Sequence, residues 1–156
     1  TGYYRIIEEA PDTYLAEESH YRLIIQYFED PEGPRPDKAE EVYRQYFERY
    51  DEPRLGFTIN TTMARMYFNF QLWDRLASFM VPFIREYVNT GELKDPLFLF
   101  YYSEAKFHLE DYDEALRGYR MLIREQPGKV ELNFARRRIR EIRHILDPSI
   151  NMKEQQ

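Results

Sequence analysis

Apolar residues recur every three or four positions along most of this chain, which is the spacing of one face of an α-helix. Between residues 13 and 29, for example, Tyr14, Tyr21, Ile24 and Phe28 follow this pattern. The chain is therefore expected to be all-α. The predicted helices span about residues 3–10, 13–29, 37–50, 54–70, 73–89, 95–109, 112–126 and 130–146.

Proline and glycine separate these helices, because neither residue continues a helix well. Residues 30–37 hold three prolines and one glycine and predict the longest turn. We expect one domain over residues 1–148 and a disordered tail at 149–156. Its predicted parts are the end of a preceding repeat at 1–10, helix pairs at 13–50, 54–89 and 95–127, and a capping helix at 130–146.

Several single residues mark the predicted helix ends. Asp12 or Thr13 can cap the second helix, since a side-chain oxygen there satisfies a free backbone N–H. Gly91 can end the helix at 73–89 in a left-handed conformation. Pro82 falls inside that helix and predicts a kink or a local break.

Residues 105–127 contain the most informative pattern, a helix end, a tight turn at Glu110-Asp111 and a second helix. Ala115 and Tyr119 lie one turn apart on the second helix, and Pro127 follows it. This order of small, aromatic and proline residues is typical of a tetratricopeptide helix–turn–helix unit. The register repeats, since Ala39 and Leu76 are 37 residues apart and Leu76 and Ala115 are 39 apart.

On these residues the chain resembles the tetratricopeptide repeat superfamily, most closely its bacterial envelope subset, which includes an outer-membrane assembly lipoprotein and the Tol–Pal coordinator. Residues 3–28 and 101–127 carry the resemblance. It implies antiparallel helix pairs stacked into a right-handed superhelix (an α-solenoid), a protein-binding scaffold, and a periplasmic or outer-membrane assembly role. Two positions depart from the pattern: Leu76 replaces a small residue at the helix crossing, and Ser103 takes a small position in the last repeat.

The net charge of −6 disfavours nucleic acid as a partner, because phosphate backbones need a basic surface. Residues 1–60 hold 14 acidic and 7 basic side chains, whereas residues 128–148 hold 3 acidic and 6 basic ones. The absence of cysteine excludes disulfides and thiolate metal sites. No apolar run reaches the roughly 18 residues of a membrane span. The opening Thr1-Gly2 suggests a fragment of a longer protein.

No residue pattern predicts catalysis, a metal site or a cofactor. The three histidines, His20, His108 and His144, lack a second histidine at ligand spacing and are expected in helix salt links or on solvated faces. Adjacent carboxylates such as Glu17-Glu18 point about 100° apart on a helix and are also expected on solvated faces. We therefore expect a protein that is not an enzyme.

In stacked repeats the first helix of each pair lines an inner groove. Such a groove would be aromatic with one positive and one negative charge, and would suit an apolar or amphipathic partner segment. The same residues could instead be covered by another part of the same chain, and both alternatives stay open. The predicted groove residues are Thr61, Arg65, Phe68, Leu97, Phe100, Glu104 and Phe107.

A run of arginines on the last predicted helix forms a possible second site. A charged outer face that keeps a capping helix soluble is one explanation, and a docking patch for an acidic partner is the other. For the whole chain, a cytosolic regulatory domain and a structural spacer with its groove filled in cis are the alternatives to an envelope scaffold. The arginines of this patch are Arg136, Arg137, Arg140 and Arg143.

Overall fold

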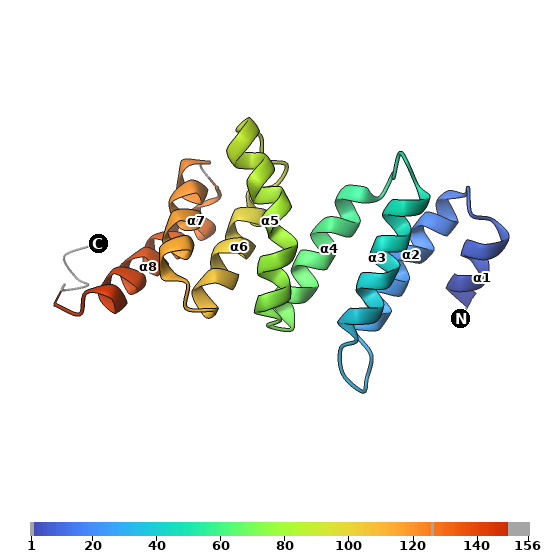
Figure 1. The fold of residues 1–156 in the computed structure, drawn as a ribbon, viewed down its shortest axis with the longest axis horizontal. Helices are drawn as coiled ribbons and strands as arrows, with labels where there is room; N and C mark the ends of the chain where they lie inside the picture. Colours follow the sequence, from blue (N-terminus) through green and yellow to red (C-terminus); the bar gives the residue numbers. More distant parts are fainter. Residues whose placement is uncertain (1, 126, 150–156) are drawn as a thin grey trace. The chain divides into compact units, whose positions relative to one another are not determined.

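The computed structural model describes residues 2–125 and 127–149, and in these ranges it consists of eight α-helices without a β-strand (Figure 1). The all-α prediction is therefore confirmed, and each predicted helix is present with ends shifted by a few residues at most. The helices are α1 (Gly2–Glu9), α2 (Tyr14–Phe28), α3 (Pro36–Arg49), α4 (Gly56–Asn69), α5 (Trp73–Thr90), α6 (Leu97–His108), α7 (Tyr112–Arg124) and α8 (Lys129–Leu146).

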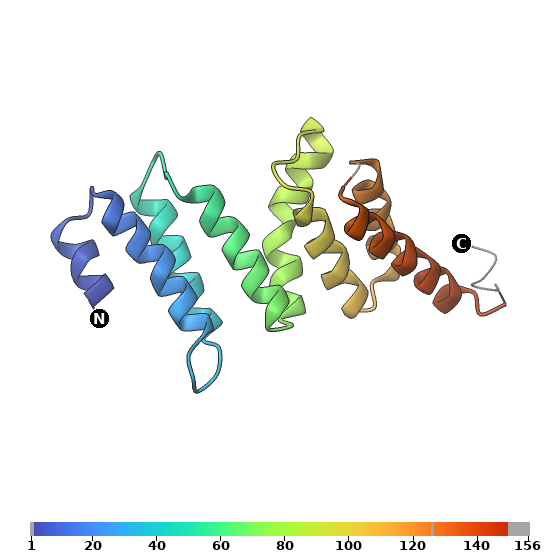
Figure 2. The same ribbon diagram turned by 180° about the vertical axis from the view of Figure 1, so that it is seen from behind.

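The helices form two compact units, residues 1–70 with α1 to α4 and residues 71–156 with α5 to α8 (Figures 1 and 2). In unit 1, α2 packs against α1, α3 and α4, and in unit 2, α6 packs against α5 and α7, with α8 packed on α7. The predicted pairs 13–50 and 95–127 each lie inside one unit. The two helices of the predicted pair 54–89 belong to different units.

The predicted caps are present. The side chain of Thr13 accepts a hydrogen bond of 3.1 Å from the N–H of Ala16 at the start of α2. Gly91 ends α5 with φ 74°, a left-handed conformation that a residue without a Cβ adopts at no steric cost. Of the two alternatives predicted at Pro82, a kink or a local break, the break is absent, because α5 is continuous from Trp73 to Thr90 and Pro82 is exposed.

The turns that precede α5 and α7 share one unusual backbone conformation. Gln71 has φ 58° and Glu110 has φ 63°, and these two residues are 39 positions apart. Each is followed by an N-cap residue and then by an aromatic residue, Trp73 or Tyr112, that opens the next helix. The spacing equals the one between Leu76 and Ala115, which are both fully buried. Local conformation and burial therefore repeat with the period found in the sequence.

Helices α6 and α7 approach closely at a pair of small residues. A Cβ added to Gly118 would lie 3.2 Å from the Cβ of Ser103 and 3.5 Å from its Cα, and would also meet its hydroxyl. Position 103 therefore requires a small residue, because only a small side chain allows α6 and α7 to cross at this distance.

Replacing Gly118 with alanine is expected to lower the free energy of unfolding by about 1–2 kcal/mol, because overpacking outweighs the gain in helix propensity. In a Ser103→Gly background the same change should stabilise the protein, by up to about 1 kcal/mol. Urea denaturation followed by far-UV circular dichroism measures both values. Equal effects of Gly118→Ala in the two backgrounds would contradict the close approach.

Candidate functional site

The predicted groove residues fall in both units and are considered unit by unit. In unit 1, Arg65 is exposed on α4, while Thr61 and Phe68 are half-buried. The hydroxyl of Thr61 donates to the carbonyl oxygen of Thr58 at 3.0 Å, within the same helix. Of these three residues Arg65 is therefore the most open to a partner.

In unit 2, residues of α8 contact part of the predicted groove surface of α6. The ring of Phe100 packs on Phe134 of α8 with 5.3 Å between centroids. The guanidinium of Arg138 lies 4.0 Å from the ring centroid of Phe107. Leu97, at the start of α6, is 36% exposed. Two of the predicted groove aromatics are thus in contact with another part of the same chain.

Glu104 differs most from its predicted role, because it is 3% exposed and therefore cannot contact a partner at an open surface. It accepts hydrogen bonds from the hydroxyl of Tyr119 on α7 and from Nε (3.0 Å) and Nη2 (3.2 Å) of Arg138 on α8. Arg138 also donates to Glu141 at 2.8 Å. We call Glu104, Tyr119 and Arg138 the unit 2 polar network; it joins three helices.

The unit 2 polar network also determines how its members titrate. Burial raises the pKa of Tyr119, and the neighbouring carboxylate of Glu104 raises it further. Burial alone would lower the pKa of Arg138, but its hydrogen bonds to Glu104 and Glu141 raise it instead. Arg138 is therefore a permanent cation and Tyr119 a permanent donor, which suits a structural function rather than proton transfer.

Unit 1 holds a matching arrangement around Glu17, which is 2% exposed on α2. Its carboxylate accepts from the hydroxyl of Tyr46 at 2.9 Å, from the backbone N–H of Arg54 at 3.0 Å and from Nε of Arg54. Glu17, Tyr46 and Arg54 form the unit 1 polar network. The expectation that Glu17 and Glu18 both lie on a solvated face is therefore wrong for Glu17, whereas the Glu18 side chain remains 33% exposed.

His20 is likewise buried rather than solvated, with 1% of its surface exposed. Its ring lies 5.4 Å from the ring of Tyr46 and 5.5 Å from the ring of Tyr50, and Nδ1 is 2.8 Å from the carbonyl oxygen of Ala16. Burial lowers the pKa of His20 below its ordinary value of 6.5, and the charge of Arg49 acts in the same direction. The opposing influences are the Ala16 carbonyl and Glu17.

Unit 1 is expected to lose stability as the pH falls below about 6.5, because the unfolded chain then protonates His20 more readily than the folded one. The contribution of His20 is complete above pH 6.5 and disappears as the pH falls through the lowered folded pKa. In a His20→Phe variant, urea denaturation between about pH 7 and about pH 5 should give a flatter dependence of the free energy of unfolding. A wild-type slope retained in full by the variant would contradict this.

The other two histidines occupy different surroundings. His108 is near the surface, with Nε2 3.8 Å from a carboxylate oxygen of Glu104, and its ring stacks on Trp73 at 4.1 Å with an interplanar angle of 7°. His108 thus lies beside Glu104, the carboxylate one helical turn before it. His144 is half-buried on α8.

The arginines of the predicted basic patch on α8 differ in their exposure and in their contacts. Arg136 and Arg143 are exposed, and Arg140 is half-buried. Arg137 lies 3.9 Å from Glu141 and 5.0 Å from the ring centroid of Phe134. Arg138, which belongs to the same run of arginines, does not share this outer face and turns toward Glu104.

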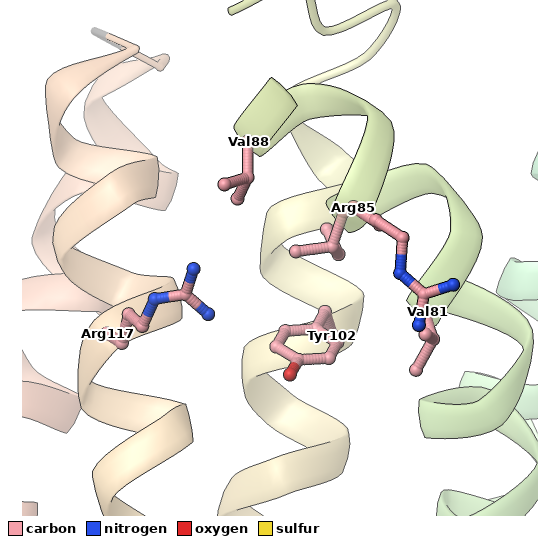
Figure 3. A pocket seen from close by; sticks show the side chains of 6 residues that line it. Val81, Arg85, Val88, Tyr102 and Arg117 are labelled. Atoms are coloured by element: carbon pink, nitrogen blue, oxygen red, sulfur yellow. The ribbon is translucent and has the colours of Figure 1, made fainter. Parts of the chain in front are cut away.

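Unit 2 also has a cleft between α5 and α7, which the sequence patterns did not indicate. Two adjoining cavities, of about 230 and 390 Å³, make up this feature, which we call the α5–α7 cleft. They share Val88 and Arg117. Figure 3 shows Val81, Arg85 and Val88 on α5, Tyr102 on α6, and Arg117 extending from α7 toward them. The other lining residues are Ile84, Tyr87, Gly91, Met121, Arg124 and Glu125.

Two tyrosines that line the cleft, Tyr102 and Tyr87, each bind a carboxylate. Tyr102 donates to Glu114 at 2.5 Å, and Tyr87 donates to Glu125. Burial raises the pKa of both tyrosines, and the adjacent carboxylates raise it further, so both hydroxyls stay protonated. Arg117 lies 3.3 Å from Glu114. The two acidic groups are thus held by neighbours within the fold.

Two further properties of the described residues bear on the kind of site. Within residues 2–125 and 127–149, His, Asp and Glu side chains form no group of three placed to hold a metal ion. Across the described part of the chain, none of the helices combines the length and apolar character needed to cross a lipid bilayer. Comparisons with protein-family models, with curated proteins and with solved structures find no match to the chain.

Proposed function

We propose that this chain is a tetratricopeptide-like helical-repeat scaffold that binds a segment of another protein and carries out no reaction of its own. The observation that supports it most directly is the repeated turn, with Gln71 and Glu110 both left-handed and 39 residues apart. Proteins built from such repeats stack helix pairs into a solenoid and present extended surfaces to partners. The proposal extends this arrangement to the whole chain.

The distribution of polar groups is consistent with a scaffold. The most buried carboxylates, Glu17 and Glu104, each bind a tyrosine and an arginine from other segments of the fold. Side chains so engaged are not available for acid–base chemistry on a substrate. They instead stabilise the packing between helices, as a rigid binding surface requires.

A second candidate function, a structural spacer whose groove is filled in cis, is favoured by one observation. The contacts of Phe134 with Phe100 and of Arg138 with Phe107 place α8 over part of α6. A partner would then have to use another surface of unit 2 or a surface of unit 1. The envelope location and an outer-membrane assembly role stay predictions from the resemblance.

Affinity capture tests the proposed scaffold against the spacer. The immobilised chain is incubated with an extract of its source cells, and bound proteins are eluted with an excess of the free chain and identified by mass spectrometry. A scaffold should retain a small, reproducible set of proteins that the free chain displaces. A charge-matched helical protein on the same resin is the control. Retention of the same proteins by both resins would contradict the proposed function.

A further inference from the structure

The walls of the α5–α7 cleft carry apolar residues at helical spacing. Val81 and Val88 are seven positions apart on α5, which corresponds to about 10 Å along the helix. Val88 is 50% exposed, and Met121 on α7 is 3% exposed at the cleft. A bound helix with apolar residues at positions i, i+3 or i+4, and i+7 would match this length.

The charges at the rim of the cleft are predominantly positive. Arg85 and Arg124 are exposed, and neither forms an ion pair with another residue in the described ranges. Arg117 contributes a third guanidinium, shared with Glu114. The three guanidiniums of Arg85, Arg117 and Arg124 thus outnumber the two nearby carboxylates, Glu114 and Glu125, whose oxygens also accept hydrogen bonds from Tyr102 and Tyr87.

The distribution of charge between the two units also favours an acidic ligand at this cleft. Residues 1–70 hold 14 acidic and 8 basic side chains, whereas residues 71–156 hold 14 of each sign. The full charge of −6 thus belongs to unit 1, and unit 2 is electrically neutral overall. An acidic ligand is therefore repelled by unit 1 and finds exposed cations at the cleft of unit 2.

We propose that the α5–α7 cleft binds an amphipathic helix of a partner protein, with an apolar face set against Val81 and Val88 and with acidic side chains beside Arg85 and Arg124. The proposal rests on the proposed scaffold function and specifies the partner's chemistry. Apolar walls favour a peptide over a polyanion such as nucleic acid, which would leave them without contacts.

A phage-displayed library of helix-forming peptides, about twelve residues long, selected on the full chain tests the proposal. Enriched peptides should place apolar residues at helical spacing with Asp or Glu flanking them. Their affinity is then measured by fluorescence anisotropy on the wild type and on an Arg85→Glu/Arg124→Glu variant. We expect Kd to rise at least about tenfold, because both charge pairs become repulsive.

The matched control is Arg136→Glu/Arg143→Glu, which makes the same change in charge at exposed positions of α8. It should leave Kd within about twofold of the wild type. A Val88→Asp variant, at a half-exposed position, should also abolish binding without unfolding the chain. Far-UV circular dichroism confirms that each variant is folded.

The outcomes separate the two proposals. Selected peptides that lack acidic residues, or that bind the cleft variant as well as the wild type, would overturn the assignment of the cleft and leave the scaffold function standing. A library from which no peptide is enriched on the folded chain would count against both. Loss of affinity in the cleft variants alone, with the control unchanged, would support both.

Discussion

Replacing Arg138 with alanine is expected to lower the free energy of unfolding of unit 2 by about 3 kcal/mol. The change leaves the carboxylate of Glu104, 3% exposed, without its cationic partner, and removes the guanidinium from the faces of Phe107 and Phe134. The value is at the lower end for a buried ion pair because the Arg138 side chain is itself 18% exposed. Urea denaturation followed by Trp73 fluorescence reports on this unit.

The neighbouring Arg137 supplies a matched control for this prediction. It lies on the same helix, its side chain is 58% exposed, and its closest carboxylate contact is 3.9 Å. Arg137→Ala should change the free energy of unfolding by at most about 0.5 kcal/mol. If the two alanine variants are equally stable, the unit 2 polar network does not hold α8 in place.

Replacing Glu17 with alanine is expected to destabilise unit 1 by about 2–3 kcal/mol. The hydroxyl of Tyr46, fully buried, loses its acceptor, and the backbone N–H of Arg54 loses its side-chain partner. Tyr46 keeps one contact, since its oxygen accepts from Leu55 at 3.0 Å, and this limits the loss. Thermal and urea unfolding followed by far-UV circular dichroism give the change.

The effect of Glu17 should also depend on pH. Burial alone would raise the pKa of Glu17, but hydrogen bonds from Tyr46 and Arg54 outweigh burial and lower it below 4.5. Its contribution is therefore complete above about pH 4.5 and disappears as the pH falls through the lowered folded pKa. Glu18→Ala, at the adjacent, partly exposed position, is the control. It should lower the free energy of unfolding by at most about 0.5 kcal/mol. Similar losses from the two alanine variants would refute the unit 1 polar network.

The sequence predicted the helices well because their signals are local. The apolar spacing of α2, the cap at Thr13 and the left-handed end at Gly91 each depend on residues within a turn or two. The same holds for the tight turn at Glu110-Asp111. At Pro82 the sequence left a kink and a break as alternatives, and α5 continues through this residue because an exposed proline ring can be accommodated on the solvent side of a helix.

The buried carboxylates were missed because their partners are distant in the chain. Glu17 binds Tyr46 and Arg54, which are 29 and 37 positions away. A signal was nevertheless present: Ile24 and Phe28 follow Glu17 by seven and eleven positions and so share its helix face. A carboxylate centred on an apolar face requires a partner, and the abundance of tyrosine in the chain provided candidates.

For the predicted groove, the sequence left an open face and a face covered by the same chain as alternatives. Leu97, Phe100, Glu104 and Phe107 do lie on one helix, as expected. On this helix α8 packs over part of the face through Phe134 and Arg138, a contact between distant segments that no local pattern could select. The α5–α7 cleft could not be predicted from the sequence, because its lining residues come from three helices and no local pattern specifies how these helices are placed.

The packing of α8 also bears on the behaviour of concentrated protein. Its anchoring contacts, Arg138 to Glu104 and Phe134 to Phe100, join residues more than thirty positions apart, and Pro127 and Gly128 separate it from α7. The same contacts can form when the helix comes from a second molecule, so two copies can exchange their last helices and become a dimer. A synthetic peptide of residues 129–146 would compete in this exchange, and size-exclusion chromatography would detect the dimer as a peak that the peptide diminishes.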